Sequence, residues 1–137
     1  MEPLTTGRLA RHGQVNIETI RYYERQGLLQ TPRRLASGYR IFSHDSVQRV
    51  RFIKRAQKLG FSLHEIKELL SLRMGRSGRE ISAVKQMAAA KITDIDEKIR
   101  VLAGMRTILQ NLEKQCPGSG SVQACPILSS LEDVGGA

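Results

Sequence analysis

Two thiols are the side chains of this sequence best suited to specific chemistry. Both cysteines of the chain, Cys116 and Cys125, lie in one short segment, CPGSGSVQAC. Thiols can bind a soft metal ion or switch between dithiol and disulfide. In a reducing cytoplasm a purely structural disulfide is uncommon. The pair therefore indicates a metal ligand, a redox sensor or two unused thiols, and the residues alone leave these alternatives open.

The histidines and glycines offer no comparable site. His12, His44 and His64 fall on different expected elements, without a paired nucleophile or the spacing of metal ligands. The Gly-Ser-Gly of residues 118–120 follows an expected helix instead of opening one, so it is not a phosphate-binding loop. We therefore expect that the protein is not an enzyme.

The position of the charge indicates where a partner binds. Residues 1–80 carry 16 Lys and Arg against 7 Asp and Glu, whereas residues 81–137 carry six of each. This distribution predicts that the N-terminal part meets a polyanion and that the rest meets a ligand or a second copy. A basic surface that serves only solubility is the alternative.

The chain shows no sign of a membrane segment. It has no apolar run of 18 residues, and its first residues, MEPLTTGRLARHGQ, lack the apolar core of a secretory signal. We expect a soluble cytoplasmic protein with no membrane partner.

Two short helices are expected near the N-terminus. The segment TTGRLARHG predicts a helix that ends at Gly13, and Asn16 is a good N-cap for a second helix that ends at Gly27. Joined by HGQV, they are typical of a helix-turn-helix whose second helix presents IRYYER to a DNA groove.

A small hairpin is expected next. The segment TPRRLASGYRIF contains Pro32 and Gly38 among aromatic and β-branched residues, as in a wing. Its cationic side chains could bind phosphates and its tyrosine a sugar or backbone edge; these residues are Arg33, Arg34, Tyr39 and Arg40. We expect Phe42 to fill the small core instead.

Two supporting helices follow the wing. Ser43 is expected to cap the helix in HDSVQRVRFIKRAQKLG, and Ser62 with Glu65 forms a capping box for the helix in LHEIKELLSLR. The glycines of MGRSGRE then indicate a hinge at residues 75–80.

A long helix is expected over residues 81–115. The segment has no proline, and its apolar residues recur every three or four positions on one stripe. Such a stripe must be covered, which favours a homodimeric coiled coil over folding back onto the N-terminal domain. The expected interface residues are Ile92, Ile95, Ile99, Leu102 and Leu109.

The motifs together carry a family resemblance. IRYYERQGLL, SGYRIF, RVRFIKRAQKLGFSLHEIKELL and a long helix before a cysteine loop, in this order, resemble the thiophilic heavy-metal-responsive branch of the MerR family of winged-helix transcriptional regulators. The resemblance implies a mainly α fold. It places a winged helix-turn-helix domain at residues 1–74, a hinge at 75–80, an antiparallel dimerisation helix at 81–115 and a metal-binding loop with a C-terminal tail at 116–137.

The resemblance also implies partners and contact residues. A homodimer would bind double-stranded operator DNA and distort the promoter so that RNA polymerase can use it, activating metal-resistance genes. Matching positions in the recognition helix are Arg21, Tyr22 and Tyr23, and Tyr39 and Arg40 match the wing contacts. Because Tyr23 is close to the core position Ile20, we expect its ring to pack partly in the core.

The loop CPGSGSVQACPI resembles the metal-binding loop of that branch, with Cys116 and Cys125 as ligands. Family sensors of divalent ions usually add a third cysteine at the start of the long helix, where this chain has Ile81 beside Ser82. We therefore expect a two-coordinate site that favours Cu(I) or a similar monovalent ion, with Hg(II) as the first alternative. A redox-switched regulator and a nonspecific nucleoid-type DNA binder are the remaining hypotheses.

Overall fold

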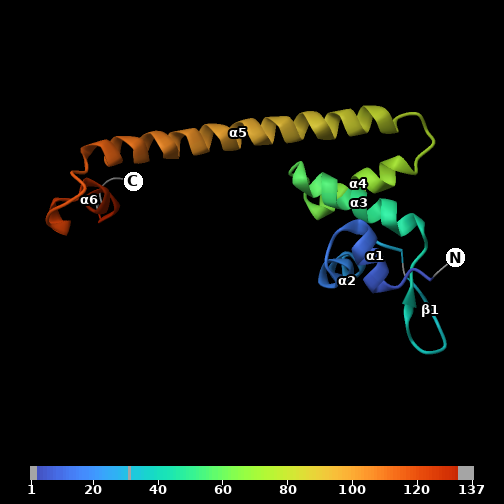
Figure 1. Ribbon diagram of the computed structural model, residues 1–137. Coiled ribbons are helices and arrows are strands. Elements are labelled where there is room, and N and C mark those ends of the chain that lie inside the picture. The colour runs from blue at the N-terminus through green and yellow to red at the C-terminus, as the bar shows by residue number, and fades with distance from the viewer. Residues whose placement is uncertain (1–2, 31, 133–137) are drawn as a thin grey trace. The chain divides into compact units, whose positions relative to one another are not determined.

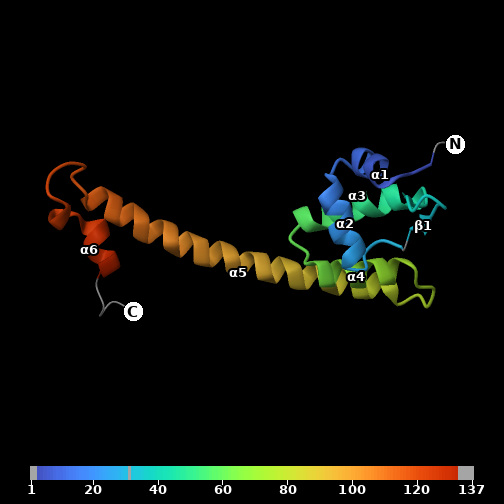
Figure 2. The same cartoon turned by 90° about the horizontal axis from the view of Figure 1, so that it is seen from below.

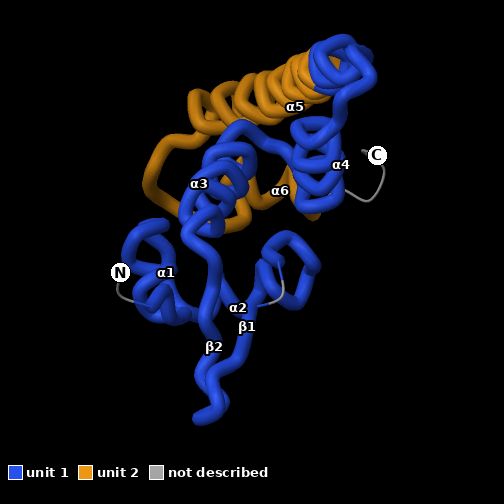
Figure 3. Tube along the Cα trace, turned by 90° about the vertical axis from the view of Figure 1, so that its right-hand side faces the viewer, with its two compact units in different colours: residues 1–87 blue, residues 88–137 orange. Residues whose placement is uncertain are grey.

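Helices dominate the computed structural model, which describes residues 3–30 and 32–132. The elements in chain order are α1 (Thr6–Gly13), α2 (Ile17–Arg25), β1 (Arg33–Arg34), β2 (Arg40–Ile41), α3 (Asp45–Lys58), α4 (Leu63–Arg73), α5 (Glu80–Gln115), the short 3-10 helix η1 (Val122–Ala124) and α6 (Pro126–Glu132) (Figure 1). The chain forms two compact units, residues 1–87 and residues 88–137 (Figure 3). The expectation of a mainly α fold with a wing and a long helix is confirmed.

The helix-turn-helix is formed by α1 and α2 (Figure 2). Asn16 caps α2 as expected, because its side chain accepts a hydrogen bond from the Thr19 N–H at 2.7 Å. In the turn, Gln14 adopts the left-handed conformation with a φ of 58°. Gly13 is buried, and a Cβ atom there would lie 2.5 Å from Cγ1 of Val50 in α3. The tight turn therefore depends on the missing side chain of Gly13.

The wing is a short antiparallel hairpin that extends beyond the helices of the first unit (Figures 1 and 3). Arg34 pairs with Arg40 in its register, and Gly38 at the turn has a φ of 88°. At its base, the N–H of Phe42 donates to the carbonyl oxygen of Leu4 at 2.8 Å. Phe42 is buried, in agreement with its expected role in the core.

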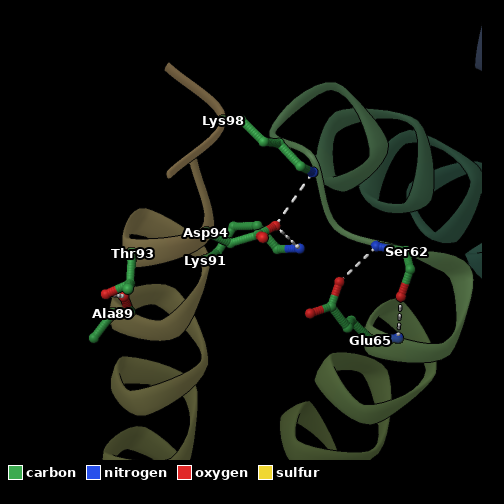
Figure 4. Close-up of polar contacts among 7 residues, drawn as sticks. All are labelled: Ser62, Glu65, Ala89, Lys91, Thr93, Asp94 and Lys98. Atoms are coloured by element: carbon green, nitrogen blue, oxygen red, sulfur yellow. Dashed lines mark hydrogen bonds and ion pairs between the residues drawn. The ribbon is translucent and has the colours of Figure 1, made fainter. Parts of the chain in front are cut away.

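The two supporting helices begin differently from each other. The capping box of Ser62 and Glu65 is confirmed: the Ser62 N–H donates to Oε1 of Glu65 at 2.8 Å, and the Glu65 N–H donates to Oγ of Ser62 at 3.2 Å (Figure 4). The expectation that Ser43 caps the preceding helix is wrong. His44 already has helical backbone angles, α3 begins at Asp45, and the Ser43 hydroxyl lies 3.3 Å from that of Ser46.

The core of the first unit lies among α1, α2, α3 and α4. The largest fully buried side chains come from these helices and from the segment after α2, and they are Leu9, Ile20, Leu28, Val50, Ile53 and Ile66. Burial of each such side chain stabilises the fold by about 1.5–3 kcal/mol. This core holds the recognition helix at a fixed position against α1 and α3.

The long helix α5 follows a linker at residues 74–79. At its start, the carboxylate of Glu80 accepts hydrogen bonds from the linker N–H groups of Ser77 and Gly78 at 2.8 Å each. Along its surface, Asp94 forms ion pairs with Lys91 and Lys98 (Figure 4). No residue of α5, all of which the structure describes, is buried within the chain.

Among the residues that the structure describes, no helix is long and apolar enough to cross a membrane.

Candidate nucleic-acid interface and thiol site

The recognition helix presents two of its three expected contact residues to solvent. Arg21 is exposed, and its Nη1 donates to Oε1 of Glu18 at 3.1 Å. Tyr22 is 40% exposed. Because the Arg21–Glu18 pair is exposed on both sides, it contributes little to stability and leaves the guanidinium available to a phosphate or a base edge.

Tyr23 points the other way. It is 3% exposed, its hydroxyl donates to Oε1 of Gln57 in α3 at 2.8 Å, and burial raises the pKa of that hydroxyl. The contact across 34 positions of sequence anchors α2 on α3. A DNA contact by Tyr23 stays a prediction, and burial leaves little of the ring accessible to DNA.

The wing carries four candidate residues. Tyr39 is 69% exposed near the turn, and Arg33 and Arg34 are exposed on β1. Nη1 of Arg34 donates to the carbonyl oxygen of Gly38 at 3.2 Å, which holds this side chain along the turn. The exposed aromatic ring and the arginines beside it are suited to a sugar-phosphate backbone.

Arg40 differs from the other wing arginines because it has a carboxylate partner. Its Nε lies 3.3 Å from Oε1 of Glu24, which belongs to α2. Sequence reasoning missed Glu24; the only available signal was an acidic residue within the otherwise basic IRYYER segment.

Two cations of α3 that sequence reasoning also missed hold the turn between α1 and α2. Nη2 of Arg51 donates to the carbonyl oxygen of His12 at 3.1 Å, and Nζ of Lys54 donates to that of Gln14 at 2.8 Å. Positive charge at the C-terminal end of a helix is favourable, so these contacts stabilise α1 and the turn before the recognition helix.

The two thiols lie at the ends of the helices that border the loop. Cys116 directly follows α5, and its N–H donates to the carbonyl oxygens of Leu112 at 3.1 Å and Glu113 at 3.2 Å. Cys125 directly precedes α6, and its carbonyl oxygen accepts from the Ser129 N–H at 3.0 Å. Both cysteines are free and half-buried.

Backbone donors favour the thiolate form of Cys125. The Leu128 N–H is the main cause that holds the pKa of Cys125 below its usual value; burial opposes this effect, and the Ile127 N–H and the Cys116 thiol reinforce it. The loop turns at Gly118 and Gly120, which have φ values of 79° and 115°. The Cys116 thiol is therefore near enough to contribute to the lowered pKa of Cys125.

The donor set of the loop fits a soft metal ion. Thiolate sulfur is the preferred ligand of such ions, and the lowered pKa of Cys125 favours its thiolate form. In the part of the chain that the structure describes, no group of three His, Cys, Asp or Glu side chains could hold a metal ion. If both thiols bound one ion, two sulfur atoms per chain would suit an ion that accepts two-coordinate geometry.

Ile81 lies in the first turn of α5 and is 84% exposed. It lines an open hollow of about 630 Å³ in the first unit, together with Phe52 and Leu69. An isoleucine offers no metal ligand, so this position adds only an apolar surface.

The expected dimer-interface residues are all exposed within one chain. They form the apolar stripe of α5, with exposed fractions between 39% and 62%, and are Ile92, Ile95, Ile99, Leu102 and Leu109. Large apolar side chains in such a row are unfavourable in water, which supports a covering partner.

A winged helix-turn-helix with exposed cations, followed by a long helix and a thiol loop, defines the class of DNA-binding transcriptional regulators with an effector site. A family model described as "MerR HTH family regulatory protein" matches residues 4–72, and one described as "MerR, DNA binding" matches residues 47–112. The chain belongs to the MerR family, and it is a DNA-binding transcriptional regulator, not an enzyme.

Individual proteins support this membership. The chain is similar to a mercuric resistance operon regulatory protein of Bacillus cereus, with 42% identity over 125 residues that cover 91% of this chain and 94% of that protein. It is also similar to the solved structure of the lead(II) complex of PbrR691 from Ralstonia metallidurans CH34, with a TM-score of 0.78, 29% identity and coverage of 92% and 97% of the two chains. The mercury(II) complex of MerR from Bacillus megaterium MB1 gives a TM-score of 0.69, 38% identity and coverage of 93% and 98%.

Proposed function

We propose that the chain is a homodimeric, metal-responsive transcriptional activator that binds operator DNA and responds to a thiophilic metal ion held by Cys116 and Cys125. The observation that carries this proposal is the pair of adjacent thiols on one loop, with Cys125 biased toward the thiolate. Thiolates are the form in which cysteines bind metals.

Hg(II) is the effector that the comparisons favour. The relative in Bacillus cereus is named for mercuric resistance, and the similar structure from Bacillus megaterium contains mercury(II). The expectation of Cu(I) from the sequence rested on Ile81 in place of a third thiol. That argument does not separate the two ions, because Hg(II) also accepts two thiolates.

The two cysteines can couple ion binding to the surrounding helices. Cys116 ends α5 and Cys125 begins α6, so shared coordination would fix the end of one helix relative to the start of the other. Cys116 and Cys125 would hold the ion as thiolates, and binding would release their thiol protons to the solvent. The Leu128 and Ile127 N–H groups prepare Cys125 for this exchange.

On the DNA side, α2 would enter the major groove while the wing contacts the phosphates. The proposed contacts are Arg21, Tyr22, Tyr23, Arg33, Arg34, Tyr39 and Arg40. As the family resemblance implies, the ion-bound dimer would distort the promoter so that RNA polymerase can initiate transcription of metal-resistance genes.

Anaerobic titration tests the thiol site. The reduced protein is titrated with Hg(II) and, separately, with Cu(I) against a competing chelator, alongside Cys116→Ser and Cys125→Ser. Ser119→Ala serves as the control within the same loop. We expect one Hg(II) per chain, lost in both cysteine variants and retained in the control.

The other outcomes are equally informative. Preferential binding of Cu(I) would restore the monovalent site expected from Ile81. Absence of binding for both ions would overturn the metal proposal and leave the redox-switched regulator, which peroxide treatment of the DNA-bound protein would then test.

A further inference from the structure

We propose that Glu24 is a positioning residue for operator binding, which sets the orientation of Arg40 and couples the wing to the recognition helix. The inference rests on the proposed operator binding by α2 and the wing. It adds a residue that has no expected contact with DNA and that acts through an arginine beside it.

The pair lies partly below the surface. The side chains of Arg40 and Glu24 are 34% and 20% exposed, and Nε of Arg40 lies 3.3 Å from Oε1 of Glu24. Nε is itself buried, and among the described residues it has no hydrogen-bond partner of standard geometry. Burial of a charged group is unfavourable without compensation, so the Glu24 carboxylate provides the compensating charge at this position.

The wing has few other links to the helices. Each of its strands is two residues long, and its base is joined to the N-terminal segment by the hydrogen bond from Phe42 to Leu4. A two-stranded hairpin is marginally stable by itself. The ion pair is therefore an additional tertiary link between the wing and α2, and its loss would loosen the wing relative to α2.

The geometry leaves Arg40 able to bind DNA. A guanidinium carries five N–H donors, and the contact with Glu24 engages only Nε, so the two terminal nitrogens could bind a phosphate. Glu24 thus favours one orientation of the Arg40 guanidinium in the free protein. Such preorganisation strengthens binding because less conformational freedom is lost in the complex.

The direction in which DNA affinity changes when Glu24 is replaced distinguishes a positioning role from general electrostatic repulsion of DNA. A carboxylate near DNA repels phosphates, so its removal by itself would strengthen binding to every duplex. A positioning role predicts the opposite for the operator: Glu24→Gln weakens operator binding, while binding to a scrambled duplex is unchanged or tighter.

The experiment measures fluorescence anisotropy with two duplexes of equal length. One is selected from a random library by the wild-type dimer, and the other is its scrambled sequence. We expect Glu24→Gln to reduce operator affinity about tenfold without reducing affinity for the scrambled duplex. Glu18→Gln is the matched control, since it removes the same charge from the same helix but from an exposed pair; its operator affinity is expected not to fall.

A double-mutant cycle tests whether Glu24 acts through Arg40. In an Arg40→Gln background, Glu24→Gln is expected to cause no further loss of operator affinity. An equal loss in both backgrounds, or no loss from Glu24→Gln in the wild-type background, would overturn the inference. Failure of the wild type itself to prefer the selected duplex would instead contradict the proposed function.

Circular dichroism establishes that each variant folds. If Glu24→Gln does not fold, Glu24→Asp carries the test, because it keeps the charge on a side chain shorter by one methylene group. This variant is expected to weaken operator binding without weakening scrambled binding, and unchanged operator affinity would overturn the inference.

Discussion

At the scale of single residues, exposure separates contacts that DNA can reach from contacts that hold the fold. Arg21 and Tyr39 are open to solvent, whereas Tyr23 is buried in the core. Arg40 is intermediate, because it is partly exposed while its Nε lies beside Glu24. Neighbouring residues of one motif can therefore have different roles, because a helix turns successive side chains to different faces.

Arg21→Ala is expected to weaken operator binding by about 1–3 kcal/mol if its guanidinium reads a base edge. The physical reason is that alanine removes the donors and the charge, while the exposed Glu18 pair adds little to stability. Anisotropy with selected and base-substituted duplexes measures this. An equal loss for every duplex would assign Arg21 to a phosphate instead of a base.

Cys125 is expected to react faster than Cys116 with iodoacetamide at neutral pH, severalfold in rate. The Leu128 N–H lowers the pKa of Cys125, so a larger fraction of this thiol is thiolate, the reactive form. Mass spectrometry of the Cys116→Ser and Cys125→Ser variants, each with one remaining thiol, measures the two rates. The difference is expected to shrink as the pH rises, and equal rates at neutral pH would contradict it.

At the scale of elements, the helix-turn-helix depends on close approach between α1 and α3. Gly13 leaves room for Val50, and the cations Arg51 and Lys54 hold the carbonyl oxygens of the turn. These contacts explain how a short recognition helix of nine residues keeps a defined position.

Gly13→Ala is expected to destabilise the protein by about 1–3 kcal/mol, because the new Cβ atom would overlap the Val50 side chain in a filled core. Gly7→Ala in the same helix is the control, since apart from its chain neighbours and the nearby helix backbone no atom lies within 4 Å of its added Cβ. Urea unfolding measures both. A Gly13→Ala variant as stable as the control would show that α1 can shift without cost.

The start of α5 is expected to be sensitive to acid. Hydrogen bonds from Ser77 lead the contacts that lower the pKa of Glu80 to about 2 from an ordinary 4.5. Because the folded-state pKa is depressed, this stabilisation is present above pH about 4.5 and is lost as the pH falls toward 2.

Thermal unfolding by circular dichroism across this range measures the effect. Glu80→Gln is expected to unfold at a lower temperature than the wild type near neutral pH, with the difference closing as the pH approaches 2. A constant difference would show that ionisation of Glu80 does not stabilise the helix start.

At the scale of the whole molecule, the unburied apolar stripe of α5 is the main argument for a second copy. A helix of 36 residues without one fully buried side chain gains little tertiary stabilisation within its own chain. Association through the stripe would also bring two winged domains to one operator.

Ile99→Gln is expected to weaken the dimer and lower operator affinity, because each interface would lose an apolar side chain on both helices and bury an amide. Glu97→Gln introduces the same residue on the other side of the helix and is expected to leave the dimer intact. Sedimentation velocity over a range of concentrations measures the oligomeric state. A monomeric wild type, or equal behaviour of the two variants, would contradict the proposed interface.

Much of this protein follows from its sequence because the relevant interactions are local. The cap at Asn16, the capping box of Ser62 and Glu65 and the extent of the long helix depend on neighbours within one turn, so spacing reveals them. The order of the motifs was sufficient to indicate the MerR family. The Ser43 cap was missed because backbone angles at His44, and not residue type, determine where α3 begins.

Only the tertiary structure decided which residues far apart in sequence form ion pairs, hydrogen bonds and packing contacts with one another. The burial of Tyr23 against Gln57, the missing side chain of Gly13 beside Val50 and the pairing of Arg40 with Glu24 all join separate elements. Residue type and spacing along one segment carry no information about such partners. They are set when apolar burial brings α1, α2, α3 and the wing together, because that packing decides which polar groups must find a partner.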